Sequence, residues 1–281
     1  MPAKIIDGKA IAKKIREKIK TEVGSMKVKP GLAVVRVGDD PASIAYVNSK
    51  EKACLEAGFY SEKYELKEEV DESDLLKLIN KLNKDKKIHG ILIQLPLPAH
   101  ISQHKVLEAV SPEKDVDGFT PVNFGRLLSG NKYLVPATPK GIVRLLDEIG
   151  VKIAGRNVVV IGRSNIVGKP VAVLLLERDA TVTICHSKTK DLVEECKKAD
   201  ILISAVGKKG LVTKEIVKKD AVIIDVGITK LDGRLYGDVD FDNVKKIASW
   251  ITPVPGGVGP MTIAMLLENT LFAKRKIEEN K

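Results

Sequence analysis

The segment with the clearest chemical signature is residues 162–170, which read G-R-S-N-I-V-G-K-P. This loop follows the apolar run 158–161 and leads into a stretch of helical character. Glycine lets a backbone approach a ligand closely, and the N–H groups and dipole of a helix amino terminus favour a phosphate. Because Ser164 replaces the second glycine of the common G-x-G-x-x-G pattern, a tight structural turn also fits. The residues expected to bind the phosphates of a dinucleotide are Gly162, Arg163, Ser164, Val167 and Gly168.

The end of the next predicted strand indicates which dinucleotide this is. A unit that binds NAD carries an acid about 20 residues beyond the first glycine, where it binds the ribose diol. This chain has Cys185-His186-Ser187-Lys188 there, without Asp or Glu. Arg163, Ser187 and Lys188 supply donors and positive charge for a 2′-phosphate, so the sequence favours NADP over NAD. For His186 we expect a local hydrogen bond at the strand end rather than a catalytic role.

Two further residues follow predicted strands where the nicotinamide half of such a cofactor would lie. Gly207 comes after the third strand of the second half and Ile228 after the fourth. Ligands of open α/β sheets bind at the carboxyl ends of the strands. A glycine at such a place can also simply end a strand. Gly207 and Ile228 are candidate cofactor contacts because of their position after predicted strands.

The first half of the chain holds a second set of polar residues that could do chemistry. Tyr46 and Lys50 are four residues apart on a predicted helix, so their side chains project together. Gln94 ends an apolar strand abruptly, at the sheet edge where ligands bind. Asp117 belongs to the sequence K-D-V-D-G-F. Each has an ordinary alternative, because a Tyr/Lys pair is often amphipathic surface and aspartates are common in turns.

A glycine- and proline-rich stretch at residues 252–262 precedes the last predicted helix. It is too rich in these residues for ordinary secondary structure. Its composition favours a rigid ligand-binding loop with exposed N–H groups.

These residues need a scaffold, and the apolar pattern predicts one of alternating strands and helices. Such alternation is typical of βαβ units around a parallel sheet. In the first half the expected helices are 7–27, 41–57 and 72–83, and the expected strands are 32–37, 60–66 and 88–94. In the second half the expected helices are 140–149, 169–177, 190–198 and 260 to about 278, and the expected strands are 157–161, 181–185, 201–204 and 221–226. Residues 96–139 look irregular and contain six prolines, which places a domain boundary near 139–150.

Composition limits other classes of function. The net charge of +10 raises nucleic acid as a partner, but the lysine pairs are scattered and only 4% of residues are aromatic, so solvated helix surface is the better explanation. No apolar stretch approaches the ~18 to 20 residues that cross a bilayer, and no signal-peptide core is present. The three cysteines lack C-x-x-C spacing, so we expect no metal site and a reducing cytoplasm.

Taken together and in order, five motifs resemble one enzyme family over essentially the whole chain: the bifunctional methylenetetrahydrofolate dehydrogenase/cyclohydrolases. The motifs are Pro41-Ala42-Ser43 with Tyr46 and Lys50, Gln94-Leu95-Pro96-Leu97-Pro98, Lys114-Asp115-Val116-Asp117-Gly118, Gly162-Arg163-Ser164 with Val167-Gly168-Lys169-Pro170, and Pro253-Val254-Pro255-Gly256-Gly257-Val258-Gly259-Pro260-Met261-Thr262. Two positions depart from the family pattern, Ala137 where many members have Cys and Lys209 where Pro is usual. Neither carries an expected chemical role, so only local loop shape is affected.

The resemblance implies an α/β fold of two domains with a cleft between them. Residues 1–138 and 262–281 would form the folate-binding catalytic domain, and residues 139–261 a Rossmann-type NADP-binding domain. It also implies oxidation of 5,10-methylenetetrahydrofolate to 5,10-methenyltetrahydrofolate by hydride transfer to NADP, followed by hydrolysis to 10-formyltetrahydrofolate in the same cleft. A homodimer is expected from the family.

Residue roles follow from the resemblance motif by motif. Lys50 would be the catalytic amine and Gln94 its hydrogen-bond partner. Tyr46 would position the folate rings, and Asp117 would pair with the donor nitrogens of the pterin. A lysine beside a cationic methenyl substrate is expected to have a lowered pKa, in a useful acid/base range. The other implied substrate contacts are Leu95, Pro255, Gly256, Gly257, Val258, Gly259 and Pro260.

Two alternatives remain open at this point. Another two-domain NADP dehydrogenase, such as one resembling shikimate dehydrogenase, would share the architecture but would not explain the set of Tyr46, Lys50, Gln94 and Gly256-Gly257. A basic nucleic-acid-binding protein would show salt-dependent binding of RNA or DNA without folate-dependent NADP reduction.

Overall fold

The computed structural model describes residues 2–279, which fold into two compact α/β units. The six-stranded unit comprises the residues up to Lys13 together with Thr138–Thr262, and the three-stranded unit comprises Lys14–Ala137 together with the residues from Ile263 onward. The expected two-domain α/β fold is confirmed. By contacts, the first residues group with the six-stranded unit and not with the three-stranded one, since β1 (Lys4–Ile5) pairs with β11 (Trp250–Ile251). A two-residue strand has no periodicity that a sequence could reveal.

The three-stranded unit contains a parallel sheet in the order β3-β2-β4. Its strands are β2 (Gly31–Val37), β3 (Tyr60–Leu66) and β4 (Gly90–Ile93). Its helices are α2 (Pro41–Glu56), α3 (Glu72–Lys84), α4 (Gln103–Ala109) and α5 (Pro121–Leu128), and it shares α1 (Gly8–Gly24) and α10 (Val258–Glu279) with the six-stranded unit. Every residue of β2 and β4 is buried, as expected for parallel strands covered on both faces.

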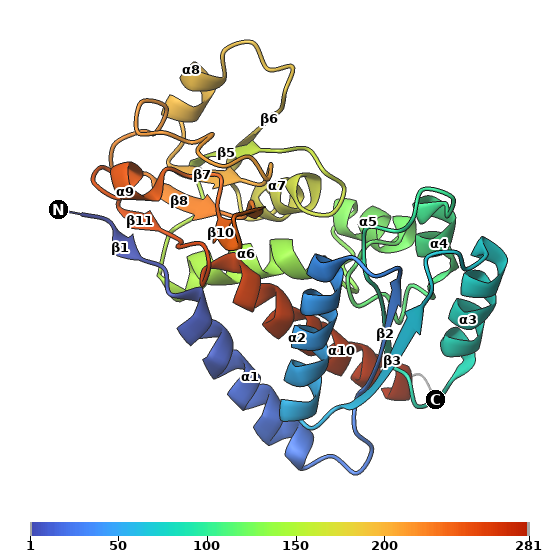
Figure 1. Cartoon of the computed structure of the whole chain (residues 1–281). Coiled ribbons are helices and arrows are strands. Elements are labelled where there is room, and N and C mark those ends of the chain that lie inside the picture. Colours follow the sequence, from blue (N-terminus) through green and yellow to red (C-terminus); the bar gives the residue numbers. More distant parts are fainter. Residues whose placement is uncertain (1, 280–281) are drawn as a thin grey trace. The chain divides into compact units, whose positions relative to one another are not determined.

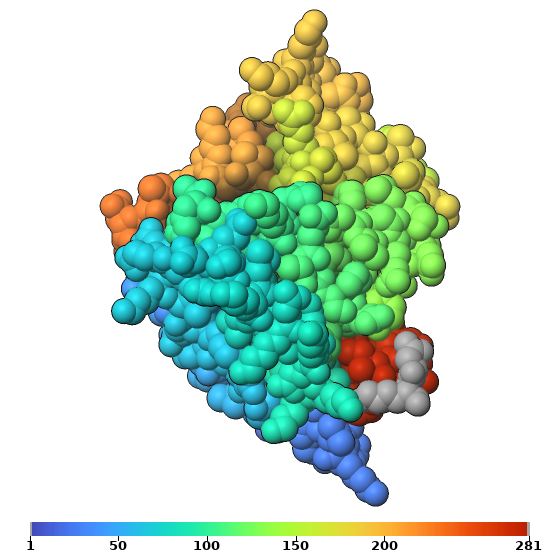
Figure 2. All heavy atoms as spheres, turned by 90° about the vertical axis from the view of Figure 1, so that its right-hand side faces the viewer, coloured from blue at the N-terminus to red at the C-terminus, as the bar shows by residue number. Residues whose placement is uncertain are grey.

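Helices cover both faces of this small sheet. Apolar side chains of α3 and α4 pack with those of β2 and β4 into one core, which includes Val35, Leu75, Ile79, Ile91 and Val106. Figure 2 shows the side of the unit that carries α3 and α4, in cyan to green. Helix α2 also covers part of the sheet, since it packs against β2 and β3 (Figure 1). The start of α2 is fixed by Asp40, whose side chain accepts a hydrogen bond from the N–H of Ser43 at 2.7 Å.

The stretch at residues 96–139, which we predicted to be irregular, contains two helices. Ser102 caps α4 and Thr120 caps α5, each accepting a hydrogen bond from a backbone N–H of the first turn. Pro121 occupies the first turn of α5, where the missing N–H costs nothing. A proline that we interpreted as a sign of irregular chain is therefore the start of a helix.

The six-stranded unit is a doubly wound parallel sheet in the order β1-β11-β8-β7-β5-β6. Besides β1 and β11, its strands are β5 (Asn157–Ile161), β6 (Thr181–Cys185), β7 (Ile201–Ser204) and β8 (Val222–Asp225). The helices are α6 (Ala137–Glu148), α7 (Gly168–Leu176), α8 (Leu192–Lys197) and α9 (Phe241–Val244), with an antiparallel hairpin of β9 (Thr229–Leu231) and β10 (Arg234–Tyr236). Figure 1 shows β5, β7 and β8 side by side. The strand order reverses at β5, and such a reversal is where open α/β sheets bind ligands.

Within residues 2–279, no helix combines the length and the apolar character that a membrane span requires.

The buried amide of Asn269 yields a test of how α10 supports the three-stranded unit. Its Nδ2 donates hydrogen bonds to the carbonyl oxygens of Val116 and Val135, both at 2.8 Å. Asn269→Ala removes these donors, so we expect a loss of about 1–3 kcal/mol in the free energy of unfolding. Thermal unfolding followed by circular dichroism should show a melting temperature several degrees lower. The exposed Asn48 on α2 is the control, and equal melting of Asn269→Ala and Asn48→Ala would contradict the prediction.

Candidate active site

The structure brings Lys50 and Gln94 together in the three-stranded unit. Lys50 lies on α2 and Gln94 follows β4, and the Nζ of Lys50 donates a hydrogen bond to the Oε1 of Gln94 at 3.1 Å. The Nε2 of Gln94 donates to the carbonyl oxygen of Leu95 at 2.7 Å. This second bond fixes which way the amide faces, so its oxygen is presented to the lysine.

Asp117 reaches the same place through the loop that follows α4. Asp115 forms a parallel bridge with Ile91 of β4, which brings the loop alongside the sheet. The buried carboxylate of Asp115 then accepts hydrogen bonds from the N–H groups of Phe119 and Thr120 and from the side chain of Asn123. Asp115 is therefore the structural aspartate of the K-D-V-D-G-F sequence.

Burial in this cluster brings the pKa values of an amine and a carboxyl group closer together. Burial lowers the pKa of Lys50, while Asp117 and Cys54 act in the opposite direction. Burial raises the pKa of Asp117 to about 6, with Lys50 opposing the rise and Asp115 adding to it. We expected a cationic substrate to lower the pKa of Lys50, and burial already does so in the protein alone. Shifted pKa values of this kind cluster at functional sites.

Tyr46 lies one turn before Lys50 on α2 and is 42% exposed. Partial burial raises the pKa of its hydroxyl, so the side chain stays neutral. An exposed aromatic ring beside polar groups is a suitable stacking surface for a flat heterocycle.

The glycine loop of the six-stranded unit has the geometry of a phosphate site. Gly162 has φ +122°, and a Cβ there would lie 2.5 Å from the carbonyl oxygen of Ala205. A Cβ on Gly168, the first residue of α7, would lie 2.1 Å from the carbonyl oxygen of Gly162. The Oγ of Ser164 accepts from the N–H groups of Val167 and Gly168 at 3.2 and 3.3 Å, which leaves its own proton for an acceptor such as a phosphate. These residues fit a dinucleotide.

The end of β6 lies beside this loop, because Cys185 pairs in register with Ile161. The Nδ1 of His186 accepts a hydrogen bond from the N–H of Lys188 at 3.1 Å, which confirms the expected local role. Ser187 and Lys188 are exposed, as is Arg163. Donors and positive charge are thus available at the ends of two neighbouring strands.

The ends of β7 and β8 carry the two candidate nicotinamide contacts. Gly207 has φ +74°, and its carbonyl oxygen accepts a hydrogen bond from the Oγ1 of Thr229 at 3.0 Å. Ile228 is 40% exposed, and Val206, next to Gly207, is 47% exposed. Apolar side chains exposed at a carboxyl edge provide a surface for a flat ring.

The glycine- and proline-rich loop belongs to the six-stranded unit and packs against the start of α1. The N–H of Lys9 donates to the carbonyl oxygen of Gly256 at 2.9 Å. A Cβ on Gly8 would lie 1.9 Å from the carbonyl oxygen of Gly257, so the two backbones touch. Pro255 and Gly259 are exposed, whereas Gly257 and Val258 are buried. The following helix begins at Val258, two residues before the predicted start at Pro260.

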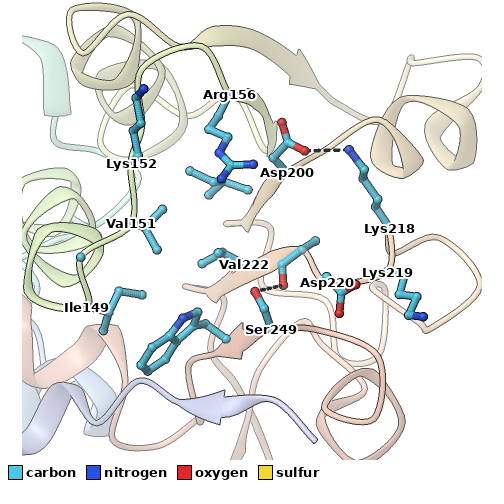
Figure 3. Close-up of a pocket in the computed structure, with 14 residues that line it drawn as sticks. Ile149, Val151, Lys152, Arg156, Asp200, Lys218, Lys219, Asp220, Val222 and Ser249 are labelled. Carbon is cyan, nitrogen blue, oxygen red and sulfur yellow. Dashed lines mark hydrogen bonds and ion pairs between the residues drawn. The ribbon is translucent and has the colours of Figure 1, made fainter. Parts of the chain in front are cut away.

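A pocket of about 330 Å³ lies at the opposite edge of the six-stranded sheet (Figure 3). Its lining includes residues at or just before the amino ends of β5, β7, β8 and β11, and the basic residues are Lys152, Arg156, Lys218 and Lys219. The Nζ of Lys218 pairs with Asp200 at 2.7 Å. Because the strands are parallel, this pocket is at the other end of the sheet from the loops after β5, β6, β7 and β8. It is therefore not the predicted cofactor site.

Sequence reasoning missed two buried acids at the carboxyl edge of this sheet. Asp225 ends β8 in the run V-I-I-D, which is the same abrupt polar ending that identified Gln94, so that signal was available. Asp238 follows β10 in a stretch without periodicity, and only the fold shows that it is fully buried.

Comparison with known proteins identifies the family of both halves of the chain. Residues 6–117 match the family model described as tetrahydrofolate dehydrogenase/cyclohydrolase, catalytic domain, and residues 136–278 match the NAD(P)-binding domain of the same family. The bifunctional protein FolD of Moorella thermoacetica is 57% identical over 280 residues, which cover 98% of this chain and 100% of that protein.

Solved structures give the same result. The bifunctional methylenetetrahydrofolate dehydrogenase/cyclohydrolase of Campylobacter jejuni has a TM-score of 0.96 and 48% identity, covering 98% of this chain and 99% of that one. The Trypanosoma brucei enzyme, solved with NADP cofactor and inhibitor, has a TM-score of 0.95 and 41% identity, covering 99% of each chain. With both domains matched, neither alternative function is needed, and this chain belongs to the tetrahydrofolate dehydrogenase/cyclohydrolase family.

Proposed function

We propose that Lys50, held by Gln94, is the catalytic group of this NADP-dependent methylenetetrahydrofolate dehydrogenase and methenyltetrahydrofolate cyclohydrolase. The observation that carries the proposal is the 3.1 Å contact between the two side chains, in a place where burial lowers the pKa of the lysine. We assign folate binding and proton transfer to residues of the three-stranded unit, and cofactor binding to the loops after β5, β6, β7 and β8. The exposed residues of the loop at 255–260 are assigned to the folate.

For the first step, bound NADP would supply the hydride acceptor for oxidation of the methylene carbon of the folate. That transfer needs alignment more than proton chemistry. We assign the alignment to Tyr46, through stacking, and to Asp117, whose carboxylate pairs with the N–H donors of the pterin. Gly162, Arg163, Ser164, Val167 and Gly168 hold the cofactor phosphates, while Gly207 and Ile228 contact its nicotinamide half.

In the second step, water adds to the methenyl carbon. The lowered pKa of Lys50 makes its neutral amine accessible, so that it accepts a proton from the attacking water. The bond from this carbon to N5 then breaks as the ammonium returns a proton to N5, and the hydroxyl proton leaves to solvent. The product is 10-formyltetrahydrofolate. The amide oxygen of Gln94 keeps the lysine in place through both proton transfers.

We also propose that the protein works in the cytoplasm as a homodimer. Its three cysteines are free and buried, which suits a reducing compartment. The dimer is expected from the family, and size-exclusion chromatography with light scattering tests it.

Lys50→Met separates the two steps. It removes the amine but keeps an unbranched apolar chain of similar length, so we expect cyclohydrolase activity to fall by about 100-fold or more, the typical contribution of a general acid or base. Both products are followed spectrophotometrically with methylenetetrahydrofolate and NADP. Lys52→Met, at an exposed lysine on the same helix, is the control. Unchanged hydrolysis in Lys50→Met would overturn the role of Lys50.

The raised pKa of Asp117 predicts a pH dependence of folate use. The carboxylate binds the pterin donors only when ionised, which holds above its pKa of about 6. The kcat/KM for methylenetetrahydrofolate should therefore fall about tenfold per pH unit below this value, because kcat/KM reports ionisations of the free enzyme. Asp117→Asn should be low at every pH and lack this limb. If its profile parallels that of the wild type, another group titrates.

Arg163→Ala tests the preference for NADP. Losing a charge-assisted hydrogen bond to the 2′-phosphate should raise the KM for NADP by about 10- to 100-fold and leave the KM for NAD nearly unchanged. Arg156→Ala, at the amino edge of the same sheet, is the matched control and should change neither constant. An equal rise of the KM for NADP and for NAD in Arg163→Ala would show that Arg163 does not bind the 2′-phosphate.

A further inference from the structure

A buried carboxylate lies inside the turn that follows β7. Asp238 is fully buried, and its Oδ2 accepts hydrogen bonds from the Oγ of Ser204 and from the N–H of Val206, both at 2.8 Å. Its Oδ1 accepts from the N–H of Lys208 at 2.7 Å. The two backbone donors lie on either side of Gly207, whose positive φ lets the chain curl around the carboxylate. Such a concave set of N–H groups is an anion-binding nest.

This nest differs from the phosphate loop because the protein itself fills it. The N–H groups of Val206 and Lys208 point inward to Asp238, so they are not available to a ligand. What the turn presents outward is the side chain of Val206, which is 47% exposed, and the backbone of Gly207. The carboxylate of Asp238 therefore determines the position of the surface that this turn presents to a cofactor.

A second acid holds the first one in place. Asp225, at the end of β8, accepts hydrogen bonds from the N–H groups of Asp238 and Val239 at 2.9 and 3.0 Å. The N–H of Asp225 donates to the Oγ1 of the buried Thr252 at 2.7 Å. The two aspartates thus connect the chain after β7, β8 and β11 through one polar cluster.

Two glycines make room for this cluster. A Cβ on Gly227 would lie 2.0 Å from the Oδ1 of Asp238, and a Cβ on Gly237 would lie 1.9 Å from the Oδ2 of Asp225. Neither glycine has a positive φ, so space and not backbone conformation requires them. A side chain at either position would displace a carboxylate, so the cluster requires both glycines.

We propose that Asp238 is a positioning residue for NADP: its carboxylate, enclosed by the turn at 206–208, sets where Val206 and Gly207 meet the nicotinamide half of the cofactor. The inference rests on the proposed cofactor contacts at Gly207 and Ile228. Asp238 acts through the turn and does not touch the reacting atoms. It serves the hydride-transfer step, since hydrolysis of the methenyl group requires no nicotinamide.

Asp238→Asn is the central experiment. The variant keeps the size of the side chain but sets an NH₂ group against the N–H of Val206 or of Lys208, so the turn must shift. Without an acceptor there, alignment is lost, and we expect the Kd for NADP measured by titration calorimetry to rise about tenfold. The kcat of the dehydrogenase should fall at saturating NADP, and cyclohydrolase activity measured on methenyltetrahydrofolate without cofactor should keep its wild-type rate.

Two further variants keep the test decisive. Asp232→Asn makes the same substitution at an exposed aspartate between β9 and β10, and it should leave both activities and the Kd unchanged. Ser204→Ala removes one of the three donors and keeps the carboxylate, so it should raise the Kd for NADP by a smaller factor of about two to three, as for one weakened hydrogen bond. If Asp238→Asn does not fold, Ser204→Ala tests the proposal in its place.

The possible results are distinguishable. Weakened NADP binding and slower oxidation with normal hydrolysis support the proposal. Equal loss of both activities in Asp238→Asn and in Ser204→Ala, together with lower melting temperatures, indicates a purely structural acid and overturns it, as does an unchanged Kd. A wild-type protein that does not reduce NADP with methylenetetrahydrofolate refutes the proposed function instead.

Discussion

Parallel strand pairing determines where the loops of each unit of this protein gather. Within each of the two sheets all strands are parallel, so the chain leaves every strand of a given sheet at the same edge of that sheet. Residues far apart in sequence, such as Gly162, Gly207 and Ile228, are thereby collected at the carboxyl edge of one sheet. The opposite edge of the six-stranded sheet holds a basic pocket but none of the glycine loops.

Burial then gives the collected polar groups their properties. Lys50 and Asp117 have shifted pKa values because α2, β4 and the loop after α4 exclude water around them. The same effect acts at Asp225, where burial raises the pKa to about 7, its backbone partners oppose the rise and Asp238 adds to it. In both units, keeping these acids out of water costs the fold some stability, because burial disfavours the charged form.

Much of the fold could be read from local patterns. The bounds of Asn157–Ile161 and Thr181–Cys185 were predicted to the residue, since each is a short run rich in β-branched residues between turn residues. The helix at Pro41–Glu56 followed from its cap and first-turn proline. Short elements were missed because their stability comes from partners: β1 exists through β11, and α4 through packing on α3. We interpreted Pro121 as a sign of irregular chain, but a proline is also favoured in the first turn of a helix, and Pro121 begins α5.

Residue types and motifs are enough to identify the chemical groups of this protein: the amine of Lys50, the amide of Gln94, the carboxylate of Asp117 and the glycines of the phosphate loop. Family membership followed from those motifs in order. The fold was needed to show that Asp115 is the structural aspartate of K-D-V-D-G-F and that Asp238 fills the turn after β7. The physical reason is that a residue type specifies which bonds a side chain can make, whereas burial and partners come from distant segments.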